Sequence, residues 1–485
     1  MSLDLTTLDG RKQFLDEIKV NENRVRKEES FKAYEIFNDR LARYVEDYLL
    51  SQFSQATVLE MPVVSSINLA KRVVVKESSV YLDPPVRTFT NLNDAQVLEL
   101  NQFYKEAQIN QKMLKANQYF RLQQQAFLMP IVKQGRFELR LLLPHQFDAI
   151  PNDDFPTDAD SFVMDTFDRS LVVTSDHNNQ SIADKDDYLS TLPRYIYWSK
   201  ELNFSFNMKG DITSDIMSNP INELPLIDIS QCKDSEFFVR TGQSLADFAI
   251  QYCGYLSDLG HVVKMQGWSV AYMKGAKDLM PKSMRVGPSI VLHLPVDPNQ
   301  PVDTEFGFAS PNPDLAGSLE YGNNLVAAFL SSRGLEPDLV SGKAIGQKYS
   351  SGLERLLAEL SQFEASKSDY DLFESVEAKL FDQIRMWSKV TVGTDEKFLS
   401  FVIPDNVEMT IQFGKPEMVQ SEKDKADLLI TKIDGGLMSR AEAIAEDRGI
   451  DIVEAEKVSA SIDKAHTDLY NPPVAGNFNA GKATT

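Results

Sequence analysis

Residues Ser351 to Lys389 read SGLERLLAELSQFEASKSDYDLFESVEAKLFDQIRMWSK, and this stretch decides the fold. Apolar side chains recur every three or four residues from Leu353 to Trp387. At 1.5 Å per residue this spacing predicts one α-helix of about 55 Å. Ser351 and Glu354 have the spacing of a capping box at its start. A helix of this length exceeds what an ordinary globular domain requires.

Two further helices and a long loop precede this helix. Apolar residues at helical spacing predict helices from Thr241 to His261 and from Pro313 or Asp314 to Ser332. Gly334 is placed to end the second helix in a left-handed conformation. The loop from Leu335 to Tyr349 is long for a compact domain, and loops of this length usually serve a function or are disordered.

Short strands are expected between those two helices. They are predicted at Trp268 to Met273, Met284 to Gly287 and Ile290 to Leu294. The next segment, Pro295 to Pro313, contains five prolines. Proline lacks the backbone N–H, so this segment is expected to be neither regular helix nor central strand.

The first half of the chain mixes helices and strands. Leu8 to Leu50 is expected to form one or two helices and Asp94 to Gln125 one helical run. Ala126 to Val132 and Phe137 to Leu143 flank the short turn Lys133 to Arg136, which predicts a β-hairpin. Further strands are predicted at Phe162 to Met164, Leu171 to Thr174, Tyr195 to Ser199 and Phe204 to Met208. The predicted fold class is α+β.

The C-terminal part returns briefly to β-structure before ending in helices. Phe398 to Ile403 and Val407 to Phe413 are predicted to pair as two strands. Gln420 to Lys464 is expected to form two or three acidic helices, separated by glycine turns. The tail from Asn471 to Thr485 is rich in small residues and has no apolar core.

Composition narrows the function classes. The chain has 485 residues, of which 50 are basic and 71 acidic, giving a net charge of −21. That charge argues against a broad surface that grips phosphates, although DNA can still slide past such a protein. No apolar run approaches the roughly 20 residues of a membrane span. Two cysteines, Cys232 and Cys253, are expected to be buried thiols in a cytoplasmic fold without disulfides.

A search for catalytic motifs finds none. The sequence lacks GxxxxGK[ST] and GxGxxG, so no phosphate-binding loop is predicted. The five histidines are isolated, without the spacing of metal ligands. Aspartate pairs such as Asp153-Asp154 lie in polar segments typical of solvated loops, where two carboxyls do not acquire different pKa values. We therefore predict no catalytic residue, no metal and no cofactor.

Several short sequence segments, taken in order, resemble segments of the portal proteins of tailed bacteriophages, especially the portal type of long-tailed phages. They are Ser66 to Val74 (SINLAKRVV), Val80 to Arg87 (VYLDPPVR), Leu142 to Pro151 (LLPHQFDAIP), Tyr195 to Trp198 (YIYW), Asn219-Pro220 with Leu224 to Ile227, Gly435 to Ala443 (GGLMSRAEA) and Glu446 to Asp451 (EDRGID). Together they span residues 68–451, and their order carries the resemblance.

The resemblance implies an α+β portal fold with a wing, a two-helix stem, a small α/β clip, a long wing helix and an α-helical crown. The implied regions are residues 1–240 (N-terminal part of the wing), 241–265 (first stem helix), 266–311 (clip), 312–333 (second stem helix), 334–349 (tunnel loop), 350–416 (wing, with the long helix and return strands), 417–470 (crown) and 471–485 (flexible tail).

The implied function is structural and non-enzymatic. A portal forms a dodecameric ring at one capsid vertex, and double-stranded DNA passes through it, without sequence recognition, during packaging and ejection. The implied partners are other copies of the chain, the terminase large subunit, a head-tail adaptor, the major capsid protein and a scaffold protein. The implied location is the portal vertex of the virion, and the host cytoplasm during assembly. The acidity would line the channel and keep DNA sliding.

Two groups of cations are candidate site residues under this resemblance. Arg333, Lys343 and Lys348 would face DNA at the tunnel loop, as sequence-independent phosphate contacts. The second group would dock terminase or the adaptor from the clip and consists of Lys274, Lys277, Lys282 and Arg285.

Two alternatives stay open at the level of sequence. One is another virion structural protein, such as a head-tail adaptor or a capsid component, which would lack the succession of helix, clip, helix, loop and long helix. The less favoured one is a metal-independent hydrolase, with a site built from the aspartate clusters and His177.

Overall fold

The computed structural model describes residues 4–166, 191–231, 233, 236–239, 244–266, 270–274, 305–309, 314–335 and 352–413, with parts of 429–462. The chain divides into two compact units, Met1–Ile345 with Ala358–Pro416, and Gly346–Leu357 with Glu417–Thr485. The fold is mixed α and β, so the predicted α+β class is confirmed.

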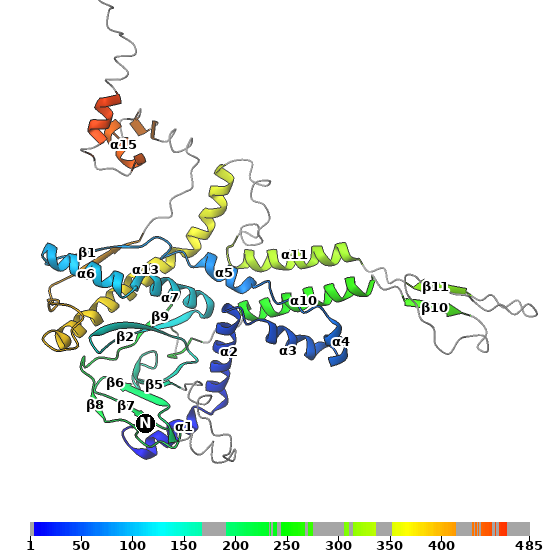
Figure 1. Cartoon of the computed structure of the whole chain (residues 1–485), viewed down its shortest axis with the longest axis horizontal. Helices are drawn as coiled ribbons and strands as arrows, with labels where there is room; N and C mark the ends of the chain where they lie inside the picture. The colour runs from blue at the N-terminus through cyan, green and yellow to red at the C-terminus, as the bar shows by residue number, and fades with distance from the viewer. Residues whose placement is uncertain are drawn as a thin grey trace, which may run out of the picture. The chain divides into compact units, whose positions relative to one another are not determined.

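Figure 1 labels most of the elements along the chain. The helices are α1 (Leu8–Glu17), α2 (Asn21–Phe37), α3 (Ala42–Gln52), α4 (Gln55–Glu60), α5 (Leu69–Glu77), α6 (Asp94–Glu106), α7 (Ile109–Gln123), α10 (Ser244–Gln266), α11 (Leu315–Ser332), α13 (Gly352–Thr391) and α15 (Arg440–Arg448). The strands are β1 (Val86–Phe89), β2 (Gln125–Lys133), β3 (Arg136–Leu142), β4 (Phe147–Pro151), β5 (Ala159–Asp165), β6 (Tyr195–Ser199), β7 (Leu202–Phe206), β8 (Met217–Ser218), β9 (Ile227–Ser230), β10 (Val270–Lys274), β11 (Glu305–Ala309) and β12 (Met409–Gln412).

A three-stranded antiparallel sheet lies in the core of the first unit. Its order is β3-β2-β9, and every residue of β2 except Lys133 is buried. The predicted hairpin of β2 and β3 is confirmed, with Lys133 paired to Arg136. Gln134 and Gly135 form the turn with φ of 53° and 71°. Positive φ at both positions matches the two-residue turns that suit the twist of a hairpin.

A five-stranded antiparallel sheet follows, in the order β4-β5-β6-β7-β8. Helix α1 covers part of it through a small apolar cluster in which Phe14 meets Phe206 edge to face. Buried Arg11 ties α1 to the turn after β7, because its guanidinium donates to the carbonyl of Gly210 at 2.5 Å. The predicted strands at 162–164, 195–199 and 204–208 are found here, whereas 171–174 lies outside the described residues.

Helix α13 confirms the predicted long helix, and at 40 residues it is about 60 Å long. Phe373, Leu380 and Ile384 on its described part are fully buried in the main core. Trp387 donates its indole N–H to the carbonyl of Pro130 at 3.0 Å, which joins the helix to β2. The C-terminal half of α13 is therefore part of the core.

Two helical predictions need correction. Residues 8–50 hold parts of three helices, because the chain turns at 18–20 between α1 and α2, and Asp39 adopts a left-handed φ of 64° between α2 and α3. Residues 94–125 hold two helices, because Gln108 has a φ of 55° between α6 and α7. Non-glycine residues rarely adopt this conformation, so sequence periodicity alone does not reveal the breaks.

The predicted strand pair at 398–413 is wrong. Only Met409–Gln412 forms a strand, β12, and it pairs antiparallel with β1. The segment 398–403 runs without regular structure, and Ile403 donates its backbone N–H to the hydroxyl of Ser388 at 3.1 Å. A partner more than 300 residues away in sequence therefore replaces the expected local one.

The helices predicted on either side of the short strands are confirmed as α10 and α11. Between them along the chain, β10 pairs antiparallel with β11. β11 lies in a segment for which no central strand was expected, and it forms in the proline-free interval 302–310 as one of two strands. The predicted strands at 284–287 and 290–294 lie outside the described residues.

The second unit contains α15, which begins with a reciprocal cap. Ser439 donates its backbone N–H to Glu442, and Glu442 donates its own to the hydroxyl of Ser439. These bonds hold the pKa of Glu442 below its ordinary value. Ala443 of α15 is buried, as are Leu429 and Ala455 elsewhere in this unit, so one of the expected acidic helices is found.

Candidate functional site

The C-terminal end of α11 contains Arg333, the only residue of the predicted DNA-facing group that the structure describes. Its Nε donates to Oε1 of Glu77 at 2.8 Å, and its Nη2 donates to Oε2 at 2.9 Å. Side-chain exposure is 23% for Arg333 and 8% for Glu77, so this fork is mostly buried. Lys343 and Lys348 lie outside the described residues.

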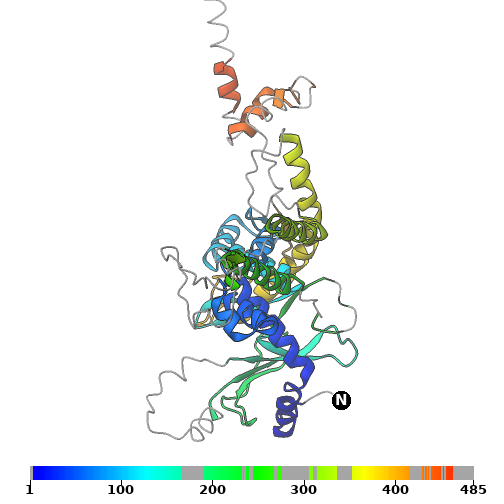
Figure 2. The same ribbon diagram turned by 90° about the vertical axis from the view of Figure 1, so that its right-hand side faces the viewer.

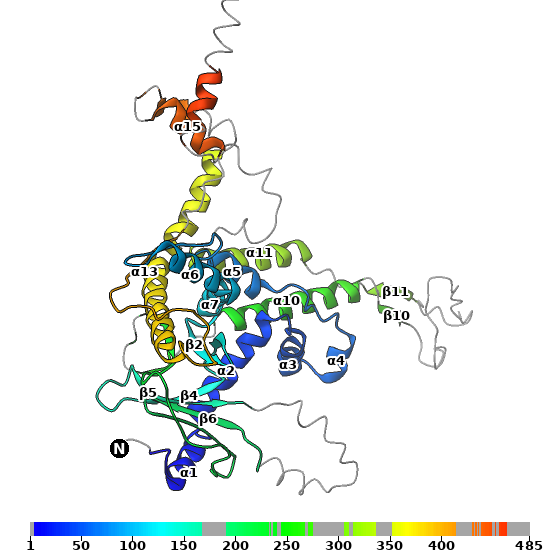
Figure 3. The same ribbon diagram turned by 60° about the vertical axis from the view of Figure 1, so that its left-hand side comes forward.

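Helices α10 and α11 lie side by side (Figures 1 and 3), and they pack through aromatic rings and glycine. Phe248 stacks on Phe329 with ring centroids 3.9 Å apart and planes within 5°. A Cβ at Gly322 would stand 2.8 Å from the ring of Tyr255, whose hydroxyl donates to the carbonyl of Ser318. Only glycine allows this close approach of the two helices.

The opposite side of α10 packs against the segment 48–64. Ser257 is nine residues after Phe248, which at about 100° per residue is half a turn around the helix. Its hydroxyl accepts the backbone N–H of Val64 at 2.8 Å. A Cβ at Gly254 would stand 2.6 Å from Tyr48 of α3. Figure 2 shows the same stacking of α11, α10 and the N-terminal helices from another side.

The outer side of α11 is exposed and almost uncharged. Glu320 is its only acidic or basic residue, although charged residues make up 25% of the chain and an 18-residue helix would carry four or five at that rate. Tyr321 and Leu325 lie within about 40° of each other around the helix and are exposed by 60% and 37%. Leu319, nearer the buried side of the helix, is exposed by 53%. A helix in contact with water normally bears charges on its outer side, so this side has the character of a contact surface.

Two buried ion pairs join α13 to the rest of the core, and sequence reasoning did not find them. Glu377, with no side-chain exposure, accepts two hydrogen bonds from Arg87 and one from Tyr81. Asp369, also without exposure, accepts Nε of Arg121 at 2.7 Å. Burial raises the pKa of Asp369 above its ordinary value. The partners are about 250 to 300 residues apart, so no local signal marks them.

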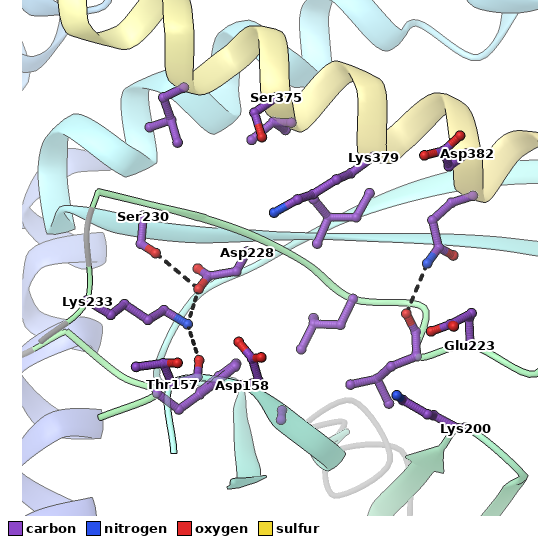
Figure 4. Close-up of a pocket in the computed structure, with 18 of the residues that line it drawn as sticks. Thr157, Asp158, Lys200, Glu223, Asp228, Ser230, Lys233, Ser375, Lys379 and Asp382 are labelled. Carbon is purple, nitrogen blue, oxygen red and sulfur yellow. Dashed lines mark hydrogen bonds and ion pairs between the residues drawn. The ribbon is translucent and has the colours of Figure 1, made fainter. Parts of the chain in front are cut away.

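A pocket of about 700 Å³ lies between α13, β9 and the start of β5 (Figure 4). Asp228 pairs there with Lys233 and accepts the hydroxyl of Ser230, while Lys233 donates to the carbonyl of Thr157. Burial raises the pKa of Asp228, but three neighbouring donors, Lys233, Ser230 and Gln125, already satisfy the carboxylate. The pair is thus internally balanced and offers no activated base.

Gln383 adds one polar feature to the pocket wall. Its Nε2 donates to the carbonyl of Leu224 at 3.1 Å, and its buried Oε1 has no protein partner. Leu226, Leu372 and Met386 supply apolar lining beside it. The pocket wall therefore offers one free hydrogen-bond acceptor beside apolar side chains. It lacks the set of nucleophile, base and stabilising groups that catalysis requires.

The remaining predicted residues divide between described and undescribed segments. Lys274 lies in β10, whereas Lys277, Lys282 and Arg285 lie outside the described residues, as does His177 of the hydrolase alternative. Asp153 and Asp154 are exposed in the turn between β4 and β5, as expected for solvated loop residues. Cys253 is a buried free thiol, and burial raises its pKa to about 11. Cys232 is not described.

Metal and membrane features were also sought in the part of the chain that the structure describes. No cluster of three or more histidine, cysteine, aspartate or glutamate side chains there has the geometry to hold a metal ion. Among the described helices, none combines the length and apolar character needed to cross a bilayer.

Comparison with known proteins finds similarity among solved structures alone. No protein-family model matches the chain, and no curated protein matches it. Among solved structures, a chain from the virion of a native gene transfer agent (GTA) particle is similar, with a TM-score of 0.37 and 11% sequence identity. The alignment covers 84% of this chain and 99% of that chain. A TM-score of this size does not establish a common fold.

Proposed function

We propose that this chain is a portal protein of a tailed bacteriophage. Twelve copies would form a ring at one capsid vertex, and double-stranded DNA would pass through its channel during packaging and ejection. The short sequence segments named above support this proposal, as does the order of α10, the β10–β11 pair, α11 and the long helix α13.

The observation that carries the proposal is the exposed, nearly uncharged side of α11. In a chain with a net charge of −21, a helix surface with one charged residue is best explained by contact with an equally uncharged surface. In a closed ring of identical subunits, each copy supplies that contact to the next. The two faces of α10 are already occupied within the subunit, which leaves α11 as the outermost helix of the pair.

The remaining parts of the proposal concern charge and partners. The acidic surplus would make the channel repel phosphates, so DNA is centred and slides without sequence recognition. Lys343 and Lys348 remain candidates for weak phosphate contact. The cations of residues 274–285 would dock terminase and then the head-tail adaptor, and the capsid protein would surround the ring.

Electron microscopy of the purified full-length chain tests the proposal. Negative-stain class averages should show twelve-fold rings with a central aperture. Mass photometry should give about 655 kDa, twelve times the 54.6 kDa of one chain. Monomers at micromolar concentration, or a closed particle without an aperture, would contradict the proposal.

A further inference from the structure

We infer that Arg333 is a positioning residue, which fixes the end of α11 against α5 through Glu77 and does not bind phosphate. This inference changes the role of one residue of the proposed DNA-facing group. Only its second part, that Arg333 does not bind DNA phosphate, rests on the proposed function. Its basis is the bidentate contact in which both oxygens of Glu77 accept N–H groups of Arg333, at 2.8 and 2.9 Å. A planar guanidinium matches a carboxylate in this geometry, and such pairs are among the stronger polar contacts in proteins.

Three contacts in succession set the course of the chain where α11 ends. Arg333 is held by Glu77, and Gly334 turns the backbone with a φ of 71°. Leu335, only 4% exposed, packs into the main core and donates its backbone N–H to the carbonyl of Leu330 at 3.0 Å. An ion pair, a left-handed glycine and a buried apolar side chain therefore act on adjacent residues, as in a Schellman-type helix end.

Glu77 is itself in a fixed position. It is the last residue of α5 and only 7% exposed, and α5 packs against α7. Its negative charge contributes to raising the pKa of Asp369 on α13, so the two carboxylates are electrostatic neighbours. Arg333 neutralises one of them and Arg121 of α7 the other. The end of α11 is thus held at a place where α5, α7 and α13 already meet.

This arrangement disfavours phosphate binding by Arg333. A guanidinium that moved to a phosphate would leave Glu77 buried and unpaired beside Asp369, and burying an uncompensated charge is costly. The paired groups also have no net charge, so they exert little long-range attraction on DNA. Arg333 therefore fixes the backbone at residues 333–335, where α11 ends.

Hydrogen exchange on Glu77→Gln tests the positioning role. We expect the amides of Gly334 and Leu335 to exchange at least tenfold faster in this variant and in Arg333→Gln, with amides of α6 unchanged. The double variant should exchange no faster than either single one, because both remove the same contact. Arg333→Lys should restore protection only in part, since an ammonium cannot form the fork. Unchanged protection at Gly334 and Leu335 in Glu77→Gln would overturn the inference.

The salt dependence of binding to a short DNA duplex tests whether Arg333 contacts phosphate. Loss of one phosphate contact lowers the slope of log K against log salt by about 0.9. Arg333→Gln and Glu77→Gln should both keep the wild-type slope, or show no binding if the wild type shows none. A lower slope in Arg333→Gln, with an equal or higher slope in Glu77→Gln, would mean that Arg333 binds phosphate. The exchange experiment requires neither a ring nor DNA, so failure of the portal proposal would remain distinguishable from failure of this inference.

Discussion

The core around α13 and the α10–α11 pair are stabilised by different kinds of contact. In the core, Glu377 has no side-chain exposure and is satisfied by Arg87 and Tyr81. In the helix pair, stacked rings and close glycines provide the contacts, and one side of α11 stays uncovered. The first region completes its contacts within the chain, whereas α11 keeps an exposed side. Under the ring that we propose, stability of the subunit and assembly should therefore respond to different mutations.

The largest effect on subunit stability is expected from Glu377→Ala. The substitution leaves Arg87 buried at 5% side-chain exposure without its carboxylate partner. Breaking a buried pair from one side typically costs about 3–5 kcal/mol. Urea unfolding followed by circular dichroism would measure the loss, and Glu377→Gln, which keeps the shape of the side chain, should lose less.

Asp405→Asn is the matched control for Glu377. Asp405 pairs with Lys389, but the two side chains are 78% and 43% exposed, and water screens such pairs. This variant should unfold at the wild-type urea concentration. Equal losses in the Glu377 and Asp405 variants would show that the buried network does not distinguish the core.

An intermediate effect is expected from His145, which also belongs to the core side. Its Nδ1 lies 2.9 Å from the hydroxyl of Ser30, and burial, followed by the charges of Arg26 and Lys27, lowers its pKa from 6.5 to about 4. The folded state therefore binds fewer protons than the unfolded state between these values. Stability should be complete above about pH 6.5 and fall as the pH decreases towards 4.

Comparison of the wild type with His145→Gln isolates this contribution, because other groups titrate equally in both proteins. Between about pH 7 and 4.5, the wild type should lose about 2 kcal/mol of free energy of unfolding relative to His145→Gln. Urea midpoints at several pH values provide the measurement. Parallel pH profiles for the two proteins would show that His145 is not held neutral by its surroundings.

Local patterns in the sequence predicted much of the fold. The periodicity of 353–387 gave α13, and Gly135 and Gly334 mark a hairpin turn and a helix end that require positive φ. Asp39 and Gln108 break helices at positions where the residue type gives no warning. Pairing between distant segments could not be predicted from the sequence. The segment 398–403 was therefore predicted as the partner strand of β12, a place that β1 takes in the structure.

The candidate site could be predicted less fully from the sequence, for the same reason. The sequence shows that Arg333 follows a helix, but Glu77, which determines what the guanidinium does, is 256 residues away. An exposed cation and a paired one look identical in a sequence. By contrast, the lack of charge on α11 is visible in its letters, although only the structure tells which side is exposed.

The smallest effect on subunit stability, and the sharpest test of the comparison, is expected from Leu325→Glu. Leu325 is 37% exposed on the outer side of α11, so a carboxylate there meets water in an isolated subunit and should leave the free energy of unfolding nearly unchanged. In a ring the same carboxylate would be buried without a partner at every interface, which is strongly unfavourable. Leu98→Glu is the control, because Leu98 on α6 is 72% exposed and lies away from the helix pair. Mass photometry should show subunits for Leu325→Glu and rings for Leu98→Glu. If both variants assembled equally, the uncovered side of α11 would face solvent in the particle, and the α10–α11 pair would differ from the core only in composition.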